Sequence, residues 1–185
     1  RSLLHLLDHG ALRAQIAAQL NAFEDALGHV PAFVDGHQHV HQLPVVRDVL
    51  LAELAQRYPR HRPWLRATRA LPWRSAGIGA ANAFKAATIQ SLGARAFVRS
   101  ARRLGFARNR RLLGVYGFDG DAAHYLGLLR AWLRAAQDGD LLMCHAGLAA
   151  AHGAARSDPI ATARATEYEL LRGADFGELL RAEGI

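Results

Sequence analysis

The stretch that decides the fold class reads Phe33-Val34-Asp35-Gly36-His37-Gln38-His39-Val40-His41. Its apolar start, which follows Pro31, is typical of a short strand, and Asp35-Gly36 ends that strand. Similar apolar runs recur at 64–68, 112–118 and 140–144, and helical patterns separate them. Strands that alternate with helices predict an α/β fold with a parallel sheet. About four strands are expected, fewer than the eight of a closed barrel.

The helical patterns between these runs have recognisable ends. A first helix is expected over 11–27, where Gly28 follows, and a second begins near Pro44 and ends before Pro59. Further helices are expected over 80–104, with a weak point at Gly93, over 121–136, and from Asp158 to the residue before Gly173.

Length and composition are those of one ordinary soluble domain. The chain has 185 residues, of which 51% are apolar and 21% charged, enough for a hydrophobic core. Charged residues interrupt every apolar run, so a membrane span is excluded. Cys144 is the single cysteine, which rules out an internal disulfide and suits a reducing compartment. We therefore expect a cytoplasmic protein.

The chain is strongly basic, with a net charge of +7, and all of its basic residues are arginines except Lys85. This charge permits binding to nucleic acid or another anion. The arginines are spread through the expected helices except at 99–111. We interpret that segment as a solvated face, and keep a non-enzymatic, Arg-rich anion-binding domain as an alternative.

Histidines follow the strand at 33–34 in a pattern that suits a metal ion. In an extended chain alternate side chains share a face, so Asp35, His37, His39 and His41 would converge. Neutral imidazole is a common metal ligand, and a carboxylate can bind the ion or orient an imidazole. Hydrogen-bonded or solvent-facing histidines are the alternative. His37 and His41 would also share a helical face, so the choice of ligands stays open.

A second candidate group lies near the last expected strand. His145 follows that strand, and Gly147 gives room for a close turn, so His145 is a candidate general acid or a further ligand. Arg164 and Glu167 are three residues apart on the last helix, where we expect a buried, mutually neutralising pair, and the alternative is a pair that points into a polar cleft.

Three elements, in order, resemble the YdjC-like (ChbG/HpnK) carbohydrate deacetylases. They are the 33–41 stretch with Pro44 after it, Leu142-Met143-Cys144-His145-Ala146-Gly147, and Arg164 with Glu167-Tyr168 and Leu171. The family's usual His-Pro-Gly is His145-Ala146-Gly147 here. The family also begins with a strand that carries an Asp-Asp pair, and has a further strand with a metal-binding histidine; neither is found in this chain. The resemblance therefore implies a single domain over 1–185, an incomplete (β/α) barrel-like fold without its N-terminal strands.

The resemblance implies a metal-dependent hydrolase that removes N-acetyl groups from amino sugars or related glycoconjugates, of the hopanoid-associated or chitooligosaccharide deacetylase type. It implies a divalent metal ion, Mg or Zn, with ligands among His37, His39 and His41, and His145 as the catalytic acid. It implies that four further residues bind substrate or orient catalytic groups: Asp35, Arg66, Arg164 and Glu167. Because ligands are missing, we expect this chain alone to be inactive or nearly so.

The enzymatic alternative is a metal-dependent amidohydrolase or phosphoesterase of barrel type, in which an Asp-x-His-x-His run ends the first strand. Here a helix precedes that run, and the elements around His145 and Arg164 would be unexplained. The expected partner is an acetylated carbohydrate, with no specific nucleic acid. Open strand edges would allow copies of the chain to associate, so a homo-oligomer is also considered.

Overall fold

The computed structural model describes residues 7–72, 78–148 and 158–185. The chain divides into two compact units, each with its own small sheet and hydrophobic core. Unit 1 holds Arg1–Arg69 and Thr88–Arg111, and unit 2 holds Ala70–Ala87 and Leu112–Ile185.

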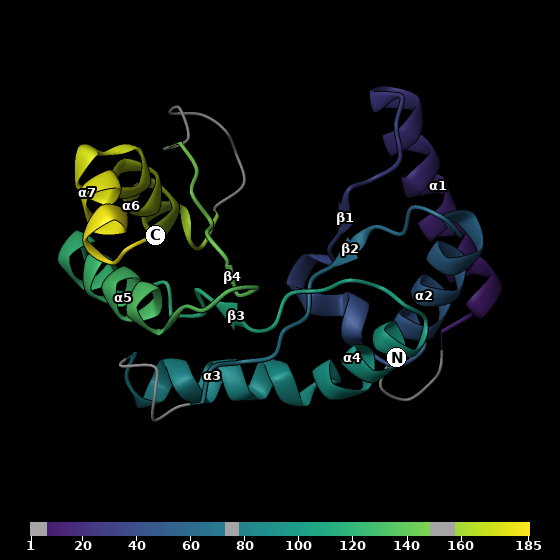
Figure 1. Cartoon of the computed structure of the whole chain (residues 1–185), viewed down its shortest axis with the longest axis horizontal. Coiled ribbons are helices and arrows are strands. Elements are labelled where there is room, and N and C mark those ends of the chain that lie inside the picture. The colour runs from purple at the N-terminus through teal and green to yellow at the C-terminus, as the bar shows by residue number, and fades with distance from the viewer. Residues whose placement is uncertain (1–6, 73–77, 149–157) are drawn as a thin grey trace. The chain divides into compact units, whose positions relative to one another are not determined.

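Helices and two short strands make up unit 1 (Figure 1). Its elements are α1 (His9–Leu27), β1 (Phe33–Val34), the 3-10 helix η2 (His37–Gln42), α2 (Val46–Arg57), β2 (Trp64–Leu65) and α4 (Ala94–Arg103). The boundary between the units falls inside α3 (Ala80–Ser91). β1 and β2 pair in parallel, with Phe33 opposite Trp64. Their carboxyl ends therefore place Asp35 and Arg66 at one edge of the sheet.

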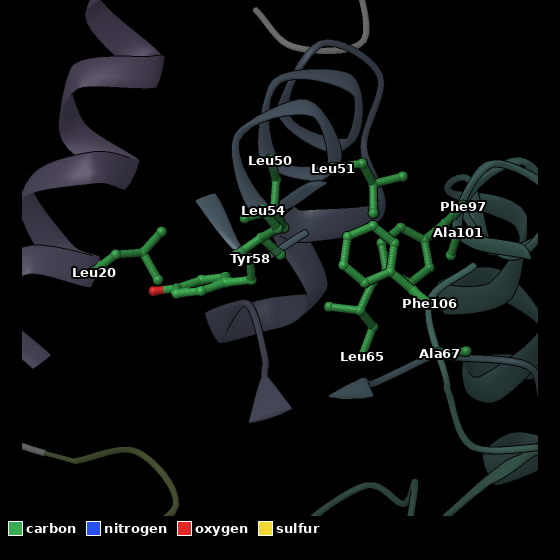
Figure 2. Close-up of a cluster of buried hydrophobic side chains, with 10 residues drawn as sticks. All are labelled: Leu20, Leu50, Leu51, Leu54, Tyr58, Leu65, Ala67, Phe97, Ala101 and Phe106. Atoms are coloured by element: carbon green, nitrogen blue, oxygen red, sulfur yellow. The ribbon is translucent and has the colours of Figure 1, made fainter. Parts of the chain in front are cut away.

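The core of unit 1 forms where α1, α2 and α4 pack on β2. Figure 2 shows the Tyr58 ring reaching toward Leu20 of α1. Leu54 and Phe97 are completely buried, which removes their whole apolar surface from water. The full set of buried residues is Leu20, Leu50, Leu51, Leu54, Tyr58, Leu65, Ala67, Phe97, Ala101 and Phe106.

Unit 2 also combines a parallel pair of strands with helices. β3 (Leu112–Leu113) pairs with β4 (Leu141–Leu142), and α5 (Ala122–Ala135), α6 (Ala161–Arg172) and α7 (Ala174–Ala182) pack in sequence order (Figure 1). Trp132 and Leu129 of α5 are almost fully buried and lie in the core with Tyr116, which follows β3.

The α/β class with parallel strands is confirmed, but the strands are shorter than expected. Within the described residues they form two two-stranded sheets and no closed barrel. A single domain over 1–185 with an incomplete barrel-like fold stays a prediction.

Two expectations about helices differ from the structure. The helix expected over 80–104 is two helices, because Gly93 has a φ of 130° and a Cβ there would lie 2.4 Å from the Gln42 carbonyl oxygen. The last expected helix is followed by α7, which the sequence reading missed.

Candidate active site

The segment after β1 is a tight turn and not the extended chain we expected. Residues His37–Gln42 form η2, in which Gln38 and His39 have φ values of 50° and 64°. The alternation on which the predicted convergence of Asp35, His37, His39 and His41 rested is therefore absent. His37 is exposed, His39 is half-buried and His41 is buried.

His41 faces the interior, and backbone groups bind both of its ring nitrogens. The Gly36 N–H donates to Nδ1 at 3.1 Å, which leaves Nε2 to donate to the Arg66 carbonyl oxygen at 2.8 Å. Burial lowers the pKa of His41, because an imidazolium loses hydration there. A Cβ on Gly36 would lie 2.7 Å from Nδ1, so only glycine allows this approach. With both nitrogens occupied, His41 offers no lone pair to a metal ion in this arrangement.

Asp35 and Arg66 meet at the carboxyl ends of β1 and β2. Arg66 Nε donates to Asp35 Oδ1 at 2.5 Å, and a terminal nitrogen of Arg66 donates to the Gly36 carbonyl oxygen at 3.0 Å. The Arg66 side chain is only 6% exposed, so the Asp35 carboxylate balances a charge that would otherwise be costly to bury. His41 Nδ1 lies 3.8 Å from Asp35 Oδ1. These three predicted residues are thus brought together, and they fix the turn that carries His37 and His39.

The described residues do not form a complete set of metal ligands. Among them, no three His, Cys, Asp or Glu side chains lie together in a way that could hold a metal ion. The donors present in the described residues therefore do not fit the expected ion, and we derive no step through a metal.

In unit 2 a buried carboxylate holds the segment that carries His145. Glu167 of α6 is fully buried; its Oε2 accepts the His145 backbone N–H at 2.5 Å and its Oε1 accepts the Tyr116 hydroxyl at 2.6 Å. Charge-assisted bonds of this kind are among the stronger hydrogen bonds in proteins. Burial and the bond to Glu167 raise the pKa of Tyr116, so this hydroxyl stays a donor.

Arg164 holds the same segment from its other side. It donates to the His145 carbonyl oxygen at 3.1 Å and to Asp158 Oδ2 at 2.7 Å, and its own carbonyl oxygen accepts the Gly147 N–H at 3.1 Å. The carboxylate that pairs with Arg164 is that of Asp158, so the prediction of an ion pair between Arg164 and Glu167 is wrong. Instead, one helix contacts the backbone of His145 on both its N–H and its carbonyl side.

Sequence reasoning missed two residues of this group, Tyr116 and Phe118. Tyr116 closes the Glu167 network, and the Phe118 ring lies 4.7 Å from the His145 ring, between centroids, at an interplanar angle of 90°. Both lie in the apolar run over 112–118, which predicts one continuous strand, and nothing in that pattern separates them from core residues.

The chain is thus an α/β protein with polar groups at the carboxyl ends of short parallel strands, where such folds place their chemistry. The family described as YdjC-like protein matches residues 2–182, and the chain belongs to that family. A region of 57 residues is 44% identical to a carbohydrate deacetylase of Danio rerio, over 30% of this chain and 18% of that protein.

Two further relatives carry the same description. A carbohydrate deacetylase of Mus musculus is 51% identical over 25% of this chain and 15% of its own length, and one of Homo sapiens is 46% identical over 28% of this chain and 16% of its own. The matched regions thus span less than a fifth of each relative. No solved structure matches the chain. Among the described residues, no helix has both the length and the apolar character needed to cross a membrane.

Proposed function

We propose that this chain supplies the proton-donating part of a carbohydrate deacetylase, an enzyme that hydrolyses the N-acetyl group of an acetylated amino sugar. The observation that carries the proposal is the position of His145, three residues after the end of the parallel strand β4, with its backbone N–H bound by the buried Glu167 in a chain of the YdjC-like family.

In this reaction a water oxygen adds to the acetyl carbonyl carbon, and the C–N bond of the resulting tetrahedral species breaks. The departing nitrogen takes a proton from the protonated His145 imidazole, which acts as general acid. The proton that the attacking water releases restores the protonated imidazole, so the products are acetic acid, which ionises to acetate, and the free amino sugar. Glu167 is not the proton carrier, because both of its carboxylate oxygens accept hydrogen bonds inside the protein. Its role is to fix the backbone from which the imidazole projects.

The residues near β1 have a supporting role in this proposal. Asp35 and Arg66 hold the turn that carries His37 and His39. The divalent ion, Mg or Zn, that the family resemblance implies stays a prediction, and no step of the proposed reaction depends on it. A hopanoid-associated or chitooligosaccharide substrate, a cytoplasmic location and association into homo-oligomers remain predictions.

The class of substrate that the protein cleaves tests the proposal. The natural polypeptide that carries this sequence is expected to release acetate from N-acetylated chitooligosaccharides, and to leave an O-acetylated sugar and a phosphodiester unchanged. Cleavage of the phosphodiester without acetate release would favour the phosphoesterase alternative and refute the deacetylase.

A further inference from the structure

Phe118 has a backbone conformation that its residue type rarely adopts. Its φ is 64°, in the left-handed region that favours glycine. The turn around it is tight, since a Cβ on Gly117 would lie 2.5 Å from a carboxylate oxygen of Asp119. A bulky residue persists in such a conformation only where the surrounding contacts hold it, and such residues cluster at functional sites.

The contacts that hold Phe118 lead to His145. The Phe118 and His145 rings meet edge to face, with centroids 4.7 Å apart. The Lys85 Nζ lies 4.7 Å from the centroid of the Phe118 ring, a cation–π distance, and donates to the Tyr116 carbonyl oxygen at 2.6 Å. The single lysine of the chain therefore binds both the backbone and the aromatic ring of the turn that contacts His145.

These contacts complement those of Glu167. Glu167 and Arg164 hydrogen-bond the backbone of His145, and Glu167 Oε1 also lies 3.9 Å from the imidazole Nδ1. The hydrogen bonds fix the backbone of His145 and not the rotation of the imidazole about its side-chain bonds. The Phe118 ring contacts the imidazole itself and limits that rotation. Proton transfer depends on such restraint, because a small misplacement of a catalytic group lowers the rate steeply.

We propose that Phe118 is a positioning residue that orients the His145 imidazole for proton transfer, and that Lys85 holds Phe118 in place. This inference rests on the proposed role of His145 as general acid. It assigns a function to the strained turn and to the lone lysine, neither of which takes part in the reaction itself.

Two substitutions at Phe118 distinguish the effect of the ring contact from the effect of the strained backbone. In Phe118→Asn the new residue tolerates the left-handed backbone but lacks the ring, whereas Phe118→Tyr keeps the ring. In the natural polypeptide we expect Phe118→Asn to lower kcat for acetate release by about 10- to 100-fold with little change in KM, and Phe118→Tyr to retain most of the activity. Lys85→Met should lower kcat in the same sense, and Phe84→Ala, an exposed neighbour on α3, should not.

A spectroscopic measurement on the 185-residue chain tests the contact without any assay of activity. The His145 ring resonances, assigned by comparison with His145→Gln, should shift in Phe118→Asn and stay in place in Phe84→Ala. Unchanged resonances, or a wild-type kcat in Phe118→Asn, would overturn this inference alone. A wild-type polypeptide that releases no acetate would instead refute the proposed function, and with it this role of Phe118.

Discussion

Replacement of Glu167 by alanine should destabilise unit 2 more than any other single loss of a carboxylate in α6. Glu167 is fully buried and accepts two hydrogen bonds, from the Tyr116 hydroxyl and the His145 N–H. Without it, two donors lose their acceptor, at a cost of about 1–3 kcal/mol each. We therefore expect Glu167→Ala to lower the free energy of unfolding by about 2–6 kcal/mol, a large part of the stability of a typical domain.

Glu167→Gln should cost less, about 1–2 kcal/mol, since the amide oxygen still accepts one hydrogen bond and the volume is unchanged. The matched control is Glu169→Gln on the same helix, where the side chain is 60% exposed and pairs with Arg172, so its effect should stay below about 0.5 kcal/mol. Urea unfolding followed by tryptophan fluorescence measures all three variants. A Glu167→Ala variant as stable as the Glu169→Gln control would refute the reasoning.

Three further predictions concern the buried Tyr58, two glycines and the basic charge of the chain. Burial and the hydrogen bond to Glu24 raise the pKa of Tyr58 to about 12, so the free energy of unfolding should fall as the pH rises from about 10 to 12. In unfolding titrations at a series of pH values, Tyr58→Phe should reduce this fall. The same fall in the variant and the wild type would contradict the prediction. Gly93→Ala should destabilise the protein by more than about 1 kcal/mol, because a Cβ there would meet the Gln42 carbonyl oxygen. Gly127→Ala, which has open space around it inside α5, should stabilise the protein by about 0.5–1 kcal/mol. Equal melting temperatures of the two variants would contradict the close approach of Gly93 to Gln42. Binding to a polyanion such as heparin should be weak; tight binding that added salt abolishes would support the Arg-rich alternative.

The sequence predicted the α/β class because helix ends and strand ends have local causes. Gly28 follows α1 and Gly173 follows α6, and both were expected from the residues alone. Gly93 divides α3 from α4 through its approach to the Gln42 carbonyl oxygen, which is a contact between distant parts of the chain. That contact could not be predicted from local pattern.

The same limit applies to the candidate site. The sequence placed Asp35 and His145 after strands, because strand ends are visible as a change from apolar to polar residues. It did not reveal that the His41 side chain faces the interior. That orientation depends on the left-handed backbone at Gln38 and His39 and on the hydrogen bond to the Arg66 carbonyl oxygen. The spacing also predicted an ion pair between Arg164 and Glu167. In the structure Arg164 pairs with Asp158, and Glu167 accepts hydrogen bonds from the Tyr116 hydroxyl and the His145 N–H.

The most direct measurement is chemical rescue of the proton donor. In the natural polypeptide, His145→Ala should lower kcat for acetate release by about 100- to 10,000-fold with little change in KM, and added imidazole should restore part of the rate. A His145→Ala variant with the kcat of the wild type would contradict the central claim that this histidine protonates the departing amine.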